Sequence, residues 1–378
     1  MREKAEGRIT ITSLGTGYLS TDRSQDIYIP SHFTDTALNG DIVEVALEGD
    51  GLRGEVTKII SRKKTQFVGT MERRKGDPFG FVTADDYKIH TPFFVPSIKK
   101  EIKDGTKVLI ELVKWVDPKK NPVGKIIKVL GKKGDNDVEM ESIVLDKGFE
   151  IDFAEPIERE SKKIKKDQAE ITKREIGKRK DFRDLLTFTI DPNDAKDFDD
   201  AISYKKLTDN LFEVGVHIAD VGFWVKERSA IDREARKRGF SLYLVDRTVP
   251  MLPEVLSNDI CSLNPQEDKL TFSAVFKIDS QGNVKERWFG KTVIKSKRRF
   301  NYKEVQDIID GKLEDPLSPE LKSLNSLTQK MRKKRVDAGA IEFSCDELKI
   351  ELDNKGRPIK ISVEEGLESQ KLIEDLMI

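Results

Sequence analysis

Five carboxylates lie within ten residues near the middle of the chain, at Asp191, Asp194, Asp197, Asp199 and Asp200. Crowded carboxylates repel one another and lose hydration on burial, so a folded chain tolerates them only when something offsets their charge. A hard divalent cation does so, because Mg²⁺ takes oxygen ligands and is held by a few carboxylates together with water and substrate phosphate. A magnesium site is therefore one interpretation of this spacing.

Two other interpretations of the same stretch remain open. Asp and Asn are ordinary turn formers, so residues 191–200 could be a solvated turn after the strand-like residues 187–190. A calcium loop of the EF-hand type does not fit the spacing, because no Gly is sixth from Asp191 and Ile202 stands where the twelfth-position Glu is needed. The spacing alone does not decide between a metal site and a plain turn.

Composition limits the class of protein. A chain of 378 residues is too long for one ordinary core, and about two or three domains are expected. No run of about 18 apolar residues is present, so no membrane span is expected, and the N-terminus lacks the apolar stretch of a signal peptide. With only Cys261 and Cys345, a disulfide scaffold or cysteine zinc cluster is excluded and the cytoplasm is the expected location.

Charge and histidine content narrow the candidate sites further. The three histidines are far apart in sequence, so any metal here must be held by carboxylates. The net charge is zero, which argues against a uniformly basic nucleic-acid binder. Residues 161–183 nevertheless hold ten Lys and Arg against four Asp and Glu, and residues 291–303 form a second basic run. Such runs are more often solvated faces than ligand sites.

The first 130 residues form two copies of a weak repeat about 65 residues long. Each copy has short segments that alternate apolar and polar residues, with glycines at the corners, as residues 17–19 and 80–82 illustrate. This pattern predicts two small closed β-barrels of the OB type, at residues 1–65 and 66–134. Closure removes free strand edges, so each copy can bury a core despite its small size.

Aromatic residues in these repeats are candidate RNA contacts. In the second copy, residues 75–82 and 93–95 look like the two RNA-contacting stretches of cold-shock domains. Exposed rings stack on bases at roughly 1–3 kcal/mol each, while Lys and Arg follow the phosphates. The candidate rings are Phe79, Phe81 and Phe93 in the second copy and Tyr18 and Tyr28 in the first. The alternative, that rings such as Phe81 and Phe94 simply fill the barrel, is also consistent with the pattern.

The rest of the chain mixes helix and strand patterns. A polar, Gly-punctuated linker leads into a basic connector at residues 135–180. Strands are predicted at residues 211–219, 270–279 and 284–294, the last two joined by a hairpin at residues 280–283. Helices are predicted at residues 229–239, 319–336 and 367–378. The predicted fold class is therefore multidomain, with two all-β OB-type barrels followed by an α+β domain at residues 181–378.

Residues 181–378 resemble the catalytic domain of the ribonuclease II superfamily, and the bacterial ribonuclease R branch in particular. The motifs that carry the resemblance are Asp197-Phe198-Asp199-Asp200-Ala201, His217-Ile218-Ala219-Asp220, Pro250-Met251-Leu252-Pro253, Cys261-Ser262-Leu263 and Gly339-Ala340-Ile341-Glu342-Phe343. Two upstream cold-shock-like barrels match the architecture of that family, so the resemblance covers nearly the whole chain.

The resemblance implies a processive, Mg²⁺-dependent exoribonuclease that trims single-stranded RNA from the 3′ end and releases nucleoside 5′-monophosphates. Asp191, Asp197, Asp199 and Asp200 match the four aspartates of the family motif, Asp199 matching the one most tied to cleavage, and Asp194 falls outside the pattern. Tyr243 resembles the ring that stacks on the terminal base, Phe343 its partner, and Glu374 a further carboxylate of the pocket. The structural alternatives are a core tyrosine, a core phenylalanine and a solvated helix charge.

The implied chemistry agrees with elementary requirements. Phosphodiester hydrolysis needs an activated water and relief of charge on the phosphoryl and leaving oxygens, which two metals about 4 Å apart provide when acidic oxygens hold them. Asp191, Asp197 and Asp200 are expected to ligate Mg²⁺, and Asp199 to ligate it or orient the water. The expected partner is the 3′ end of single-stranded RNA, and no membrane or obligate protein partner is implied.

Family members continue with the rest of this domain and a third RNA-binding barrel. We therefore expect the chain to be a fragment, with a catalytic domain truncated at its C-terminus and little or no activity alone. Two alternatives remain. In a non-catalytic RNA-binding protein, Asp199→Asn would change neither hydrolysis nor binding. In a calcium-stabilised scaffold, Ca²⁺ would raise thermal stability far more than Mg²⁺.

Overall fold

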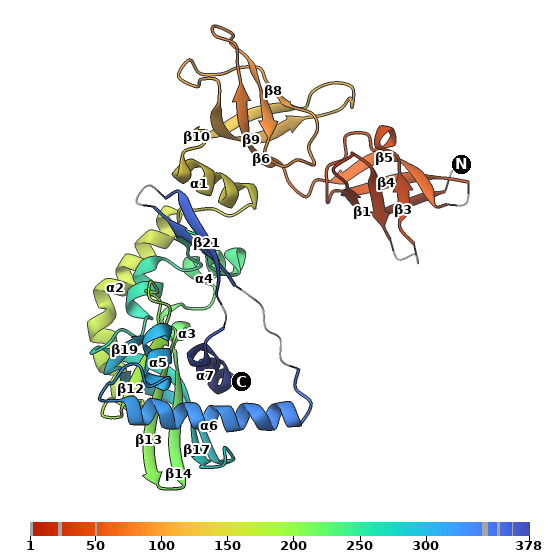
Figure 1. Cartoon of the computed structure of the whole chain (residues 1–378). Coiled ribbons are helices and arrows are strands. Elements are labelled where there is room, and N and C mark those ends of the chain that lie inside the picture. Colours follow the sequence, from red (N-terminus) through yellow and green to blue (C-terminus); the bar gives the residue numbers. More distant parts are fainter. Residues whose placement is uncertain (1–2, 22–24, 50, 342–346, 354–355, 365) are drawn as a thin grey trace. The chain divides into compact units, whose positions relative to one another are not determined.

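The computed structural model describes residues 3–21, 25–49, 51–341, 347–353, 356–364 and 366–378 (Figure 1). The chain divides into two units, Met1–Asp152 and Phe153–Ile378. Each unit has hydrophobic cores of its own.

The first unit begins with a closed barrel of five short strands in the order β1-β2-β3-β5-β4. Its strands are β1 (Lys4–Ile11), β2 (Gly17–Ser20), β3 (Ile27–Ile29), β4 (Ile42–Glu48) and β5 (Arg53–Ser61). Alternate side chains, including those of Ile9, Leu19 and Val43, are fully buried inside. The strands are short, and closure satisfies the backbone groups that an open sheet would leave unpaired.

A second closed barrel repeats this topology, since its strands follow the order β6-β7-β8-β10-β9 around the ring. The strands are β6 (Gln66–Glu72), β7 (Gly80–Ala84), β8 (Phe93–Val95), β9 (Thr106–Lys114) and β10 (Val123–Lys132). Helix α1 (Asn136–Asp146) follows, and its Glu141 pairs with Lys128 of β10 at 2.7 Å. The prediction of two OB-type barrels is confirmed.

The second unit is built on a seven-stranded sheet in the order β11-β18-β17-β14-β13-β12-β19. Its strands are β11 (Lys180–Asp181), β12 (Thr187–Asp191), β13 (Asp200–Thr208), β14 (Leu211–Ala219), β17 (Asp268–Asp279), β18 (Val284–Lys295) and β19 (Arg298–Asn301). The predicted hairpin at residues 280–283 joins β17 to β18. Consecutive residues enter different cores, as Ala201 and Ile202 show, so both faces of the sheet are covered.

Helices cover the two faces of this sheet. On the face of Ala201 lie α2 (Glu155–Ile176), α4 (Ala230–Arg238) and the π-helical turn Val255–Ile260. On the face of Ile202 lie α5 (Tyr302–Ile309), α6 (Ser318–Asp337) and α7 (Glu368–Met377) (Figure 1). This is the predicted α+β domain. The predicted basic connector at residues 135–180 contains α1 of the first unit and α2 of the second.

Smaller elements complete the second unit, namely α3 (Val221–Trp224) and the hairpins β15 (Leu242–Tyr243) with β16 (Thr248–Val249) and β20 (Glu347–Leu352) with β21 (Pro358–Glu364). The predicted signals for helix ends are used, since Ser229 Oγ accepts a hydrogen bond from the amide of Asp232 and Gly239 follows α4 with φ 81°. Among the described residues, no helix is both long and apolar enough to cross a membrane.

Candidate active site

The Asp-rich stretch connects two neighbouring strands. Strand β12 ends at Asp191 and β13 begins at Asp200, and the two strands pair antiparallel with Phe188 opposite Ile202. The intervening loop leaves the sheet and returns to it, so Asp191 and Asp200 lie at adjacent strand ends. The loop therefore brings its two terminal aspartates, Asp191 and Asp200, to neighbouring strands.

Side chains from distant parts of the chain hold this loop. Ser262 Oγ accepts a hydrogen bond from the Phe198 amide at 3.0 Å and donates one to the Lys196 carbonyl at 2.9 Å. The Arg299 guanidinium donates to the carbonyls of Pro192 and Asn193, at 3.0 and 2.6 Å. The loop is thus fixed at both ends, and it carries its carboxylates on a defined backbone.

The carboxylates of the loop perturb one another. Burial, together with the charges of Asp200 and Asp197, raises the pKa of Asp191 to about 6, although a hydrogen bond with Thr189 and the charge of Arg299 oppose the shift. Burial and the charge of Asp199 raise the pKa of Asp200 to about 6. The pKa of Asp199 is raised by burial and by Asp197. Each of the four motif aspartates therefore interacts with at least one other. A cation bound among them would lower the repulsion between their charges.

The donor chemistry of this cluster fits a hard cation. The Asp191 side chain is only 7% exposed, and its Oδ2 atom is buried without a hydrogen-bond partner in the described part of the chain. Every candidate ligand is a carboxylate oxygen, as Mg²⁺ prefers. As the side chains are placed, no three His, Cys, Asp or Glu residues of the described ranges form a preformed metal-holding group. Like charges favour separated positions, so binding would require these side chains to turn toward one another.

Tyr243 lies beside this cluster. The residue is 67% exposed, which rules out the alternative of a core tyrosine. Its hydroxyl donates a hydrogen bond to Asp197 Oδ2 at 3.2 Å. Burial of the hydroxyl and the charges of Asp197 and Asp199 raise the pKa of Tyr243. The ring therefore offers a surface for a ligand next to the carboxylates. Phe343, its predicted partner, lies outside the described residues.

Glu374 is exposed on α7, yet it is electrostatically linked to the cluster through Tyr302. Burial raises the pKa of Tyr302 to about 12, and the charges of Asp200, Asp191 and Glu374 add to the shift. Leu372 of α7 packs in the same core as residues of β12 and β13, which brings this helix to the site. The exposure of Glu374 agrees with the alternative of a solvated helix charge. Its effect on the pKa of Tyr302 agrees with a position near the aspartate cluster.

Sequence reasoning missed two residues of this site, Tyr302 and Arg299. Arg299 belongs to the basic run at residues 291–303, and such runs are more often solvated faces than parts of a site. Strand β19 runs parallel to β12, and Arg299 lies opposite Thr189. Asn301 lies opposite Asp191, so α5, which begins at the next residue, starts beside the aspartate cluster. No local pattern indicates that pairing, because more than a hundred residues separate the strands.

The barrel aromatics divide into two groups. The prediction that Phe93 contacts RNA is wrong in this structure, because the residue is 1% exposed and its ring packs against Phe67 in the core. Its neighbour Phe94 points the other way, opposite Phe81 across β7 and β8. Phe79, Phe81 and Phe94 form an outward group with centroids of Phe79 and Phe81 lying 5.8 and 5.6 Å from that of Phe94.

The first barrel carries a corresponding pair. Tyr18 lies opposite Tyr28 across β2 and β3, and their rings meet edge to face with centroids 5.8 Å apart. Both side chains reach the surface, as a role in base stacking would require.

Three family models match this chain. The RNB domain model matches residues 179–378, the cold shock domain model CSD2 matches residues 81–154, and the ribonuclease B OB domain model matches residues 7–59. Together they agree with the predicted resemblance and with the order of the domains.

Relatives and solved structures agree with these matches. Ribonuclease R of Thermotoga maritima is 38% identical over 98% of this chain and 53% of its own length, and that of Aquifex aeolicus is 31% identical over 100% and 54%. The chain therefore spans about half the length of the curated relatives it matches. Mycoplasma genitalium RNase R in complex with ribose-methylated single-stranded RNA superimposes with a TM-score of 0.88 at 27% identity, covering 99% of this chain and 60% of that one.

The fold also occurs without catalysis. Yeast Ssd1, described as a pseudonuclease, superimposes with a TM-score of 0.68 at 17% identity, covering 99% of this chain and 53% of that one. At this identity the likeness concerns the fold alone. The carboxylates of this chain, rather than its fold, must therefore carry any argument for hydrolysis.

Proposed function

The chain belongs to the RNB-domain family, and we propose that it acts as an Mg²⁺-dependent exoribonuclease. In this proposal it hydrolyses single-stranded RNA from the 3′ end to nucleoside 5′-monophosphates. The direction of degradation and the nature of the product are proposed from the resemblance to ribonuclease R. Metal dependence is proposed from the side chains of the loop between β12 and β13.

The observation that carries this proposal is the buried carboxylate of Asp191 at the end of β12, which lies within reach of the charges of Asp200 and Asp197. A buried carboxylate oxygen without a partner is costly, and the nearby charges of Asp200 and Asp197 make it costlier. A bound cation would relieve both the desolvation and the repulsion.

The site residues divide the work between holding a cation, handling water and placing the substrate. Asp191, Asp197 and Asp200 would hold Mg²⁺, which when bound polarises the phosphoryl group and lowers the pKa of coordinated water. Asp199 is the most exposed of the four aspartates, so its carboxylate can orient an attacking water and accept a proton from it. Tyr243 presents its ring beside Asp197, where an unpaired terminal base can stack.

Single-stranded RNA is the substrate class that these surfaces fit. Stacking on an exposed ring requires a base that is free of its complementary strand. The outward group of Phe79, Phe81 and Phe94 and the ring of Tyr243 all offer such surfaces. A ring stacks on the face of a base and makes no hydrogen bonds to its edges. The proposed substrate is therefore single-stranded RNA irrespective of its sequence.

The second candidate function is RNA binding without hydrolysis, which the exposed aromatic rings of the barrels would supply on their own. Asp199→Asn separates the two, with Asp194→Asn as the matched control. Asp194 lies in the same loop, is exposed and falls outside the motif. The substitution at Asp199 removes one charge and keeps the shape of the side chain.

The assay follows mononucleotide release from uniformly labelled single-stranded RNA with the protein in excess, so that slow hydrolysis is measurable in a single turnover. We expect Asp199→Asn to abolish release and retain RNA binding, while Asp194→Asn behaves like the unchanged protein. Equal release by the Asp199 variant would contradict the proposed role of Asp199. Binding without release by the unchanged protein, together with no binding of a divalent cation at the loop, would favour the second candidate.

A further inference from the structure

A buried serine holds the Asp-rich loop on both sides of Asp197. Ser262 is fully buried, and its hydroxyl accepts a hydrogen bond from the Phe198 amide at 3.0 Å and donates one to the Lys196 carbonyl at 2.9 Å. The next residue, Leu263, donates its amide to the Phe198 carbonyl at 2.8 Å. Three hydrogen bonds from two adjacent residues therefore fix the backbone from Lys196 to Phe198.

The ring of Phe198 fixes the same segment from the core. Phe198 is 5% exposed and packs in the core on the Ala201 face of the sheet. The Arg299 guanidinium carbon lies 4.9 Å from the centroid of this ring. The two flanking aspartates stay outside the core, since Asp197 is half-buried and Asp199 is exposed. The backbone and the ring of Phe198 thus determine where these two carboxylates begin.

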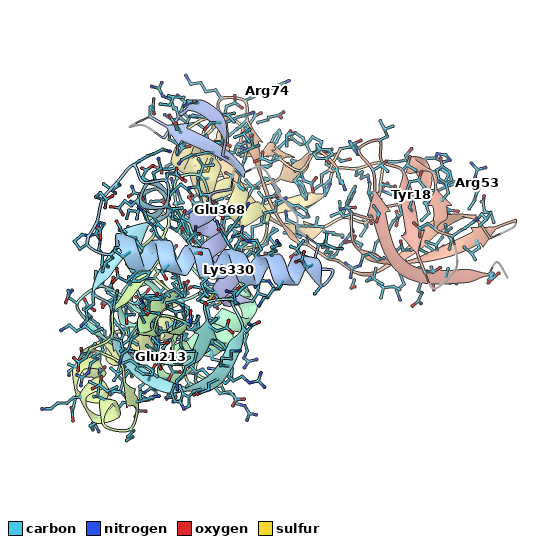
Figure 2. The ribbon with its side chains drawn as sticks, turned by 60° about the horizontal axis from the view of Figure 1, so that its bottom comes forward. Tyr18, Arg53, Arg74, Glu213, Lys330 and Glu368 are labelled. Carbon is cyan, nitrogen blue, oxygen red and sulfur yellow. The ribbon has the colours of Figure 1, made fainter. Side chains whose placement is uncertain are left out.

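Asp197 and Asp199 lie together beside Tyr243. The Tyr243 hydroxyl donates a hydrogen bond to Asp197 Oδ2 at 3.2 Å. Burial and the charges of both aspartates raise the pKa of Tyr243, so both carboxylates lie near its hydroxyl. Strand β14, on which Figure 2 labels Glu213, ends at Ala219, whose amide donates to the Asp199 carbonyl at 2.9 Å. The segment is therefore held on each side of its two carboxylates.

The alternative explanation is that Ser262 only satisfies buried polar groups, as buried serines normally do. Ser273 is an example of that role, because its hydroxyl bonds His217 Nδ1 and Thr292 Oγ1 inside the sheet. Ser262 differs, because both of its partners lie in the loop that carries the carboxylates. Loss of its hydroxyl would leave a buried loop amide without its acceptor, at a cost that the loop can avoid only by moving.

We propose that Ser262 is a positioning residue for the divalent cation of this loop. Its hydroxyl fixes the backbone on both sides of Asp197, so that the carboxylates of Asp197 and Asp199 are presented together to the ion. Ser262 contacts neither the ion nor the RNA and acts only through these two aspartates, as residues that orient metal ligands do. The inference rests on the proposed function, because it assumes that the loop holds a cation.

Manganese binding measures this positioning without any reaction taking place. The electron paramagnetic resonance signal of free Mn²⁺ falls as the ion binds, so a titration gives the affinity, and the bound ion gives its own spectrum. We expect Ser262→Ala to weaken Mn²⁺ binding about 10- to 100-fold, the usual effect of removing a residue that orients a metal ligand. The spectrum of the bound ion should also change, because the geometry of its ligands is altered.

Ser273→Ala is the matched control. It removes an equally buried hydroxyl with two side-chain partners, neither of which lies in the Asp-rich loop. We expect this variant to bind Mn²⁺ with the affinity and the spectrum of the parent protein. Hydrogen–deuterium exchange at β17 and β18 shows whether both variants keep the sheet folded.

Ser262→Cys carries the test if Ser262→Ala opens the whole unit. The thiol fills a volume close to that of the hydroxyl but is a weak donor and a weak acceptor. We expect Ser262→Cys to keep the sheet folded and to weaken Mn²⁺ binding.

Two results would overturn the inference while leaving the proposed function intact. One is Mn²⁺ binding by the folded Ser262 variants that equals binding by the parent protein. The other is equal weakening by Ser262→Ala and Ser273→Ala, since the affinity would then follow the loss of any buried hydroxyl. If the parent protein itself binds no Mn²⁺, the proposed metal dependence fails together with this inference, and the Asp199 assay decides whether the chain hydrolyses RNA.

Discussion

Phe93 and Phe94 are adjacent in sequence and have opposite roles, so replacing each with alanine should separate stability from binding. Phe93 is 1% exposed and lies in the core of the second barrel, with its ring centroid 5.1 Å from that of Phe67. Loss of a buried phenylalanine removes its transfer free energy and leaves a cavity, at a cost of about 3–5 kcal/mol. A barrel of this size has little stability to spare. We expect Phe93→Ala to unfold or greatly loosen it.

Phe94→Ala should do the reverse. Its ring lies on the surface against Phe79 and Phe81, so its loss should change the free energy of unfolding by less than about 1 kcal/mol. RNA binding should weaken about five- to a hundredfold, because a stacked base contributes roughly 1–3 kcal/mol.

Hydrogen–deuterium exchange measures both effects locally, because the amides of β6 to β10 report the opening free energy of this barrel without requiring two-state unfolding of the whole chain. Phe93→Ala should accelerate exchange throughout the barrel, and Phe94→Ala should leave it unchanged. Anisotropy with labelled RNA measures affinity. A stable barrel after Phe93→Ala, or equal destabilisation by both changes, would refute the strand register described above.

Three further predictions concern the second unit. Burial lowers the pKa of His217 from 6.5 to about 4. As the pH falls from 6.5 to 4, the unfolded chain takes up a proton at this residue more readily than the folded chain. The free energy of unfolding should therefore fall by about 3 kcal/mol by about pH 4. Hydrogen–deuterium exchange gives the free energy of unfolding of the parent and of His217→Asn at each pH. The difference between the two proteins should change with pH by this amount, and a difference that is the same at every pH would contradict the prediction. Gly215→Ala would place a Cβ 2.4 Å from Ser203 Oγ and 2.8 Å from His217 Nε2, and should cost about 1–3 kcal/mol by the same measurement. Tyr243→Phe keeps the ring and loses the bond to Asp197, so it should retain affinity for short RNA, whereas Tyr243→Ala should weaken binding about five- to a hundredfold in anisotropy titrations.

The barrels could be predicted from sequence because a two-residue alternation was visible in each short strand. Where two neighbouring residues are both apolar, the alternation cannot show which of them faces the core. Phe93 and Phe94 are both aromatic, and a shift of one residue exchanges the inner and outer faces of a strand. The closed pairing of β7 with β8 decides the question by placing Val82 and Phe93 inside and Phe81 and Phe94 outside.

The aspartates of the candidate site could also be found from sequence, since they crowd into one loop. Their surroundings could not. Arg299 and Tyr302 reach the loop because β19 pairs in parallel with β12, a contact that the chain makes across more than a hundred residues. Ser262 reaches it from the other side, where its hydroxyl bridges two backbone groups of the loop. Such long-range pairings depend on the topology of the sheet, and no local pattern carries them.

The central claim is that the loop between β12 and β13 gathers carboxylates to hold a divalent cation. Titration with Mn²⁺, which prefers the same oxygen ligands as Mg²⁺, can be followed by electron paramagnetic resonance without any reaction taking place. We predict that the parent protein and Asp194→Asn bind Mn²⁺ in competition with Mg²⁺, and that Asp191→Asn and Asp200→Asn lose this binding. Identical binding by all four proteins, or no binding by any of them, would contradict the claim.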